Sequence, residues 1–404
     1  MDFGVHYTED QQKFRKEVQA WIKANVPDNM RAPLDERTEP TPEYQSFWHK
    51  KHLELGEKGW LFPTYPKQYG GGGLTSAHET VMMEEFQKAR VPGHHADGNS
   101  LAALMVWGTE EQKQKFLVPL LTGRKTIHQK LTEPQSGADQ ANVKNKAVRD
   151  GDDWLISGEN VFISTFMNVN WLSGQATTDQ NAPRHRNTGF FIVENPAPGL
   201  LMKEQDLLVG HRQKQIFMDN VRVPGDHLIG GANQGWQVMG TLLEAEHGGR
   251  GRAAPTDYEV ESLVNHLRAN PQVGGDPVLA ERAVAAKLDA QVGELLTKRT
   301  FWMYQSHMPM QYESNLANVF QRLYTLRNAI RIREVMGLYS LLKGTDPLAP
   351  DLGRQEVAQR GRAGQNHAGG STNIAKVVLA RRIGISRTKE RAAPTPSTAL
   401  KIGG

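Results

Sequence analysis

The sequence contains no cysteine among its 404 residues. Disulfide bonds, thiolate catalysis and zinc–thiolate sites are therefore excluded, and the residue usage gives no sign of an oxidising compartment. The sequence also lacks any apolar run approaching the roughly 20 residues that a membrane-spanning helix requires. Its first residues lack the basic-then-apolar plan of a secretory signal. We expect a protein with no membrane segment and a cytoplasmic location.

Strong charge of either sign is absent as well. The net charge is +4 and the pI is near 9.0, with the basic residues dispersed except near the C-terminal end. This pattern falls short of the clustered basic footprint of nucleic-acid-binding proteins, so no nucleic-acid partner is expected. No metal site is predicted either. The length of the chain is too great for one small core and predicts two or three compact units.

The hydrophobic period changes along the chain and predicts an α+β multidomain protein. Residues 1–129 carry apolar side chains at helical spacing, and residues 130–235 form short alternating runs typical of strands. Helical spacing returns over residues 236–386, which predicts a bundle of long helices. Residues 387–404 are polar and aperiodic, so we expect a flexible tail. A four-glycine run at Gly70–Gly73 lacks the context of a phosphate loop and predicts a tight turn.

Six short motifs carry most of the functional information. The most specific one is LTEPQSGAD at residues 131–139. The others, in chain order, are GTEEQKQKF at 108–116, DGDDW at 150–154, FIS at 162–164, MDNVRVP at 218–224 and NQGW at 233–236. In sequence, order and spacing these segments resemble the acyl-CoA dehydrogenases. The segment at residues 266–288 is similar to a divergent branch that includes enzymes of sterol side-chain breakdown and heteromeric enzymes.

The resemblance implies an architecture and a set of ligands. The architecture is an N-terminal helical domain, a middle β barrel and a C-terminal four-helix bundle, with FAD between the barrel and the bundle. The substrate would be an acyl-CoA thioester, and the electron acceptor an electron-transfer flavoprotein or a similar protein. The assembly would be a homotetramer or an α2β2 heterotetramer.

The same resemblance implies the chemistry. A carboxylate removes the α proton of the thioester while the β hydrogen leaves as hydride to the flavin N5. The loop position where many members carry this carboxylate holds Gly369 here. A second group of members carries the base on the helix after NQGW, and Glu246 occupies that position. Glu244 lies on a different face of the same helix, since two residues subtend about 200°, and is expected at the surface.

The family's cofactor and substrate positions can be transferred one by one. His247 replaces the usual arginine after the base, as a structural side chain or as one that tunes the carboxylate, and is grouped with Gly369 at the substrate. Ala138 replaces a usual serine, and Phe162 a usual tryptophan that covers one flavin face. The expected flavin-binding positions are Gln129, Leu131, Thr132, Gly137, Ala138, Phe162, Ser164, Ser371 and Asn373.

Three functions remain open at this point. The first is a catalytic acyl-CoA dehydrogenase that uses Glu246 on a bulky sterol-derived or branched acyl group. The second is a non-catalytic or half-site subunit of a heteromeric acyl-CoA dehydrogenase, suggested by Ala138, His247 and Asn373. The third is a flavin oxidase on the same fold. An oxidase of this fold would use an aspartate at the loop position, and Gly369 argues against it.

Overall fold

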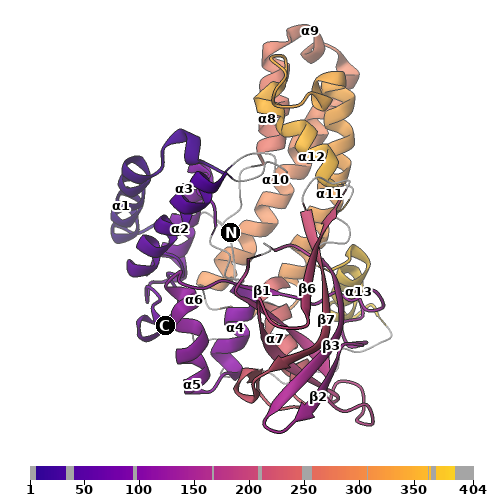
Figure 1. The fold of residues 1–404 in the computed structure, drawn as a ribbon. Helices are drawn as coiled ribbons and strands as arrows, with labels where there is room; N and C mark the ends of the chain where they lie inside the picture. The colour runs from indigo at the N-terminus through magenta and orange to yellow at the C-terminus, as the bar shows by residue number, and fades with distance from the viewer. Residues whose placement is uncertain are drawn as a thin grey trace.

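The computed structural model describes residues 6–32, 41–93, 98–165, 168–207, 212–247, 257–306, 308–362, 364 and 370–386. Helices come first along the chain, then strands, then helices again, which confirms the expected fold class (Figure 1). None of the helices in the described ranges combines the length and the apolar character needed to cross a membrane.

Helices form the first third of the chain. Helix α1 begins after Thr8, whose side chain accepts a hydrogen bond from the Gln11 main chain in a reciprocal capping box. The elements are α1 (Glu9–Asn25), η1 (Asp28–Met30), α2 (Pro42–Glu57), η2 (Lys67–Tyr69), α3 (Ser76–Ala89), α4 (Gly98–Trp107), α5 (Glu110–Gln112), the π-helical turn η3 (Lys113–Leu117) and α6 (Val118–Leu121). The apolar face predicted for α1 is buried against α3.

The glycine run forms the predicted turn. Gly70 and Gly73 have positive φ values of 95° and 60°, which favour glycine. A Cβ atom on Gly71 would lie 2.2 Å from the Tyr65 carbonyl oxygen, so the chain packs against itself here. The glycines serve a close backbone approach that leads into α3.

Eight strands form one mixed sheet in the order β6-β7-β3-β2-β4-β5-β8, with β1 paired in parallel to β4. The DGDDW motif forms a hairpin turn between β2 and β3, because Asp150 pairs with Asp153 across Gly151. Strand β1 lies in the segment that the hydrophobic period assigned to the helical block. The strands are β1 (Ile127–Gln129), β2 (Lys146–Asp150), β3 (Asp153–Ile163), β4 (Trp171–Thr177), β5 (Thr188–Glu194), β6 (Leu200–Asp206), β7 (Arg212–Val223) and β8 (Leu228–Ile229).

The C-terminal helices form a bundle around two long antiparallel members, α10 and α11, which stand beside the sheet (Figure 1). Helices α8 and α12 pack at one end of this pair, and α13 packs against α11. The elements are η4 (Gly225–His227), α7 (Gly235–His247), α8 (Tyr258–Ala269), α9 (Pro271–Gly274), α10 (Pro277–Gln305), α11 (Glu313–Met336), η5 (Gly337–Leu341), η6 (Pro350–Gly353), α12 (Arg354–Arg362) and α13 (Thr372–Arg382).

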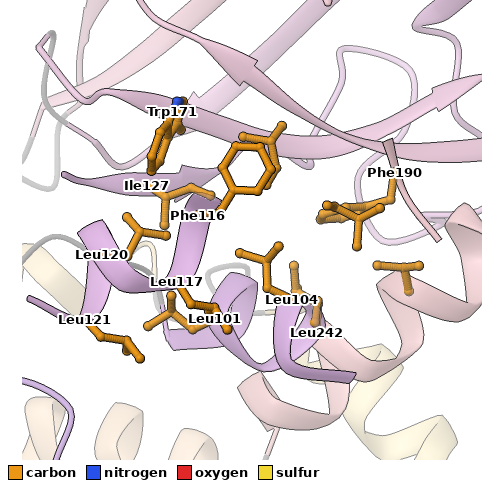
Figure 2. Close-up of a cluster of buried hydrophobic side chains, with 14 of the residues drawn as sticks. Leu101, Leu104, Phe116, Leu117, Leu120, Leu121, Ile127, Trp171, Phe190 and Leu242 are labelled. Atoms are coloured by element: carbon orange, nitrogen blue, oxygen red, sulfur yellow. The ribbon is translucent and has the colours of Figure 1, made fainter. Parts of the chain in front are cut away.

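A buried apolar cluster joins the N-terminal helices, the sheet and α7 (Figure 2). Leu104 of α4, Phe116 of η3 and Phe190 of β5 are at most 1% exposed, and so is Leu242 of α7. Truncating a buried leucine of this kind costs about 2–5 kcal/mol. The cluster therefore fixes α7, the helix that carries Glu246, against the rest of the protein.

Candidate active site

Helix α7 is held at its start and along its length. A Cβ atom on Gly235, its first residue, would lie 2.6 Å from the main chain of Gly189, so only glycine allows β5 this close. Further along, the Trp107 indole donates a hydrogen bond to the Thr241 hydroxyl at 2.9 Å. Leu242 is buried in the cluster of Figure 2. The last turn of α7 therefore has a defined position.

Glu246 lies on that last turn, at the junction of α7 with the sheet. It follows the buried Leu242 by four residues, which places it within about 40° of the same helix face. Its side chain is half-buried, whereas that of Glu244 is exposed, in agreement with the predicted surface position. Glu246 Oε2 accepts a hydrogen bond from Gln129 Nε2 at 3.4 Å. A carboxylate on α7 and the end of β1, far apart in the sequence, thus meet.

Gln129 has a second notable atom. Its amide oxygen Oε1 is buried and has no hydrogen-bond partner among the described residues. A buried acceptor of this kind costs about 1–3 kcal/mol when it stays unpaired. The side chain therefore offers a fixed acceptor beside the proposed base.

Arg322 of α11 is the site residue that sequence reasoning missed. Its side chain is half-buried, and its Nε donates to Asn318 Oδ1 at 2.7 Å. Burial lowers the pKa of the guanidinium, and the negative charge of Glu246 opposes that effect. No local pattern pointed to this residue, because its partner lies on another helix.

The loop that follows β1 is tied to the sheet by buried polar groups. The Thr132 carbonyl accepts from the Val161 main chain at 2.9 Å, which joins the loop to β3. The buried carboxylate of Glu133 accepts from the main-chain N–H groups of Lys144 at 2.6 Å and Asn145 at 3.2 Å. Burial raises the pKa of Glu133. Burial lowers the pKa of Lys130, which is 1% exposed, to about 8.

Phe162 projects from β3 in an unusual backbone conformation. Its φ is +58°, a value that non-glycine residues rarely adopt. It lies where the β3–β7 register shifts between Asn160 and Ile163. The phenyl ring is 52% exposed although its strand neighbours Val161 and Ile163 are buried. The bulge turns one aromatic face outward, and such re-aiming of a side chain is typical of bulges near functional sites.

The other predicted cofactor positions differ in their surroundings. Leu131 packs against the cluster of Figure 2. Thr132 is half-buried, and its methyl group would lie 4.0 Å from a Cβ atom added to Gly137. Ala138 is exposed, next to the Asp139–Arg184 ion pair. The exposed Ser164 hydroxyl accepts from Gln213 Nε2 at 2.9 Å.

The C-terminal candidates are brought to a different place. Ser371 caps α13 by accepting a hydrogen bond from the Ile374 main chain, and Asn373 is exposed on that helix. Helix α13 is tied instead to the start of α11, because Arg382 donates to Asn315 Oδ1 at 2.7 Å. Gly369 lies outside the described residues. His247 ends α7, and its side chain also lies outside what the structure describes.

Known proteins of one family resemble this chain. The family model described as acyl-CoA dehydrogenase, N-terminal domain, matches residues 8–124. Acyl-CoA dehydrogenase FadE26 of Mycobacterium tuberculosis is 24% identical over 93% of this chain and 96% of its own length.

Solved structures give the same result for the fold. The Tcur3481-Tcur3483 steroid ACAD superposes with a TM-score of 0.82 at 24% identity, over 96% of this chain and all of that one. The ChsE4-ChsE5 complex from Mycobacterium tuberculosis gives 0.80 at 23% identity, over 95% of this chain and all of that one.

The chain is thus similar to acyl-CoA dehydrogenases over most of its length. These matches support an oxidoreductase of the acyl-CoA dehydrogenase type. Members of the family are flavoproteins that typically hold FAD.

The residues at the end of β1 and β3 fit such a cofactor. An isoalloxazine ring presents an apolar face and, along its edge, one N–H donor and several acceptors. The exposed Phe162 ring suits the face, because offset stacking of aromatic groups is favourable. The unpartnered Gln129 Oε1 suits the donor, and the half-buried Thr132 has a hydroxyl to offer an acceptor. Gln129 ends β1, Thr132 lies on the loop after it, and Phe162 lies on β3. The hydrogen bond from the Val161 main chain to the Thr132 carbonyl joins this loop to β3.

Proposed function

We propose that this acyl-CoA dehydrogenase binds FAD beside β1 and β3, and that Glu246 removes the α proton of an acyl-CoA thioester. The observation that carries the proposal is the 3.4 Å hydrogen bond from Gln129 Nε2 to Glu246 Oε2. It joins the candidate base to the first residue of the predicted flavin contacts. A general base must lie within hydrogen-bond reach of the reacting group, and this contact supports a position for Glu246 beside the residues expected to hold the flavin.

The chain's own residues have distinct tasks in this proposal. Gln129, Thr132 and Phe162 would hold FAD, which when bound supplies acceptance of the β hydride. Glu246 accepts the α proton in its ionised form, and the Gln129 amide donates to that carboxylate and limits its rotation. The buried cluster around Leu242 keeps α7 and its carboxylate in place through the reaction.

For the substrate, we propose a bulky acyl group such as a sterol-derived or branched chain. The family resemblance implies that residue 369 stands near the reacting carbons, and a glycine at that position would leave room for a large acyl group. One structural neighbour, moreover, is named a steroid ACAD. Sterol-derived acids are lipids, so the reaction would be a step of lipid degradation. Reduced cofactor would pass its electrons to an electron-transfer flavoprotein or a similar acceptor.

We propose further that the chain works in a homotetramer or an α2β2 heterotetramer. Helix α10 supports this through a stripe of exposed apolar side chains at helical spacing, which are Val284, Leu288, Val292 and Leu295. Contiguous exposed apolar surface of this kind is typical of interfaces. One structural neighbour, moreover, is a complex of two named chains.

The base is tested by Glu246→Gln, with Glu244→Gln as the matched control on the same helix. Glutamine keeps the side-chain volume and removes proton acceptance, so turnover of acyl-CoA should fall by about 10²- to 10⁴-fold while FAD stays bound. The exposed Glu244 should tolerate the same change. Unchanged turnover in Glu246→Gln would refute the assignment of the base.

The half-site reading keeps a specific support, because Ser371 serves as a helix cap and Asn373 faces outward. The visible absorption spectrum of the chain purified alone separates the two functions. About one oxidised flavin per chain supports a complete site. A colourless chain that FAD cannot reconstitute supports a subunit that completes its partner's site, and the search then moves to that partner.

A further inference from the structure

A line of buried amide groups connects strand β3 to the loop after β1. Asn145 and Asn160 are each 1% exposed. Asn145 Oδ1 accepts a hydrogen bond from the Glu159 main chain at 2.8 Å, and Asn145 Nδ2 donates to Asn160 Oδ1 at 2.9 Å. Asn160 Nδ2 donates in turn to the Thr132 carbonyl at 3.3 Å, and to that of Lys130 at a longer 3.5 Å. Two buried side chains thus carry one line of hydrogen bonds into the loop.

The direction of each bond in this line is set by its two ends. A main-chain N–H can only donate, so Asn145 turns its oxygen toward Glu159 and its NH2 group toward Asn160. A carbonyl oxygen can only accept, so Asn160 turns its NH2 group toward Thr132. Both asparagines are therefore held in one orientation, in which Asn160 presents a donor to the loop.

The Thr132 carbonyl receives a second donor, because the Val161 main chain donates to it at 2.9 Å. Two donors use both lone pairs of a carbonyl oxygen, so the direction of this peptide group is restrained. Asn160 is also the last residue of β3 that pairs with β7 before the register shift, and Phe162 lies within that shift. One short segment of β3 therefore both holds the loop and turns the aromatic ring outward.

Asn145 also restrains the far end of the loop. Its main-chain N–H donates to the buried Glu133 carboxylate at 3.2 Å. Gly158 leaves the room that the Asn145 side chain needs, since a Cβ atom on Gly158 would lie 1.9 Å from Asn145 Oδ1. The hydrogen bonds therefore close a ring that begins and ends in the LTEP segment.

We propose that Asn160 is a positioning residue for the flavin: it holds the Thr132 peptide at a fixed place relative to Phe162, so that the loop and the aromatic ring contact one bound FAD. The inference rests on the proposed function, in which Thr132 and Phe162 hold the cofactor. Asn160 is itself buried and acts through these two residues. Contacts that are held in place before binding lose less conformational entropy when the ligand arrives. Removing the support should therefore weaken FAD binding although both contact residues remain.

The test compares two buried asparagines. Asn160→Leu removes the donor to the Thr132 carbonyl at nearly the same side-chain volume. Asn328→Leu is the matched control, because Asn328 is 2% exposed and donates at 2.9 Å to the Ala286 carbonyl, within the helical bundle. Titration of flavin fluorescence measures the FAD affinity of each variant, and denaturant unfolding measures its stability.

We expect Asn160→Leu to weaken FAD binding by roughly 10-fold, the upper end of what one lost hydrogen bond changes. Asn328→Leu should lower the stability and leave the FAD affinity unchanged. In a Thr132→Val background, Asn160→Leu should weaken FAD binding by only about 3-fold, because one of the contacts that it positions is already missing. Should Asn160→Leu fail to fold, Asn145→Leu, which leaves the Asn160 amide free to turn, should weaken FAD binding in the same direction.

Three results would overturn the inference. They are an unchanged FAD affinity in Asn160→Leu, an equal loss of affinity in Asn328→Leu, and an undiminished effect of Asn160→Leu in the Thr132→Val background. Failure of the proposed function looks different, because Thr132→Val and Phe162→Ala would then leave the FAD affinity unchanged, or the original protein would bind no FAD.

Discussion

Lys130 provides a quantitative test of how the loop after β1 is built. It directly precedes the flavin-motif residues Leu131 and Thr132, yet its side chain is only 1% exposed. Its Nζ has no hydrogen-bond partner among the described residues, and its nearest compensating charge is the buried Glu133. Burial lowers the pKa of Lys130 from 10.5 to about 8. At about 1.4 kcal/mol per pH unit, this corresponds to a penalty of about 3 kcal/mol for the charged form in the folded protein.

The pH window follows from these two values. Below about pH 8 the lysine is protonated in both states, so the folded protein carries the whole penalty. Between about pH 8 and pH 10.5 the unfolded chain binds more protons than the folded one, and the free energy of unfolding rises with pH. We therefore expect the original protein to gain about 2 kcal/mol relative to Lys130→Met between pH 7 and pH 10.

The assay is denaturant unfolding of both proteins at pH 7 and pH 10, compared as differences so that packing changes and all other titrations cancel. Glu133 does not disturb the comparison, because it keeps two main-chain donors in both proteins. Lys146→Met, at an exposed position of β2, controls for the loss of one positive charge. A stability difference that stays constant from pH 7 to pH 10 would refute the reasoning and show that Nζ is solvated in the folded protein.

Two further predictions concern the cofactor. Phe162→Ala should weaken FAD binding by about 10-fold, since an aromatic contact contributes about 0.5–1.5 kcal/mol beyond its buried area. Thermal stability should stay nearly unchanged, because the side chain is 52% exposed. Titration of flavin fluorescence measures the FAD affinity, and an unaltered affinity would remove Phe162 from the site. Ala138→Ser should strengthen the binding of FAD or acyl-CoA by about 5-fold through one added hydrogen bond. Calorimetry with each ligand measures the affinity. No gain with either ligand would show that the exposed turn at residues 137–139 lies away from both.

Much of the fold follows from local sequence signals. The apolar spacing of residues 14, 18, 21 and 22 predicts the buried face of α1, and the turn residues at 150–153 predict the hairpin between β2 and β3. These elements are predictable because the residues that define them are neighbours in the chain. Strand β1 is not, because three residues carry no readable period and its pairing with β4 depends on a distant segment.

The candidate site is predictable only in part. Glu246 is predicted from its position relative to the NQGW motif, and Gln129 from its position relative to LTEP. The hydrogen bond between them is not predicted, since the resemblance places the main chain and not the direction of the Gln129 side chain. The positive φ of Phe162 follows from a bulge whose partner strand lies some 50 residues later, so no local pattern encodes it.

Lys130 and Arg322 illustrate why charged residues are the hardest to interpret from sequence. A lysine or arginine is nearly always exposed, and only tertiary packing overturns that expectation. For Lys130 the packing is visible at Gly174, where an added Cβ would lie 2.3 Å from the Lys130 carbonyl oxygen and 3.1 Å from its Cγ. The missing side chain on β4 leaves room for the lysine stem inside the sheet.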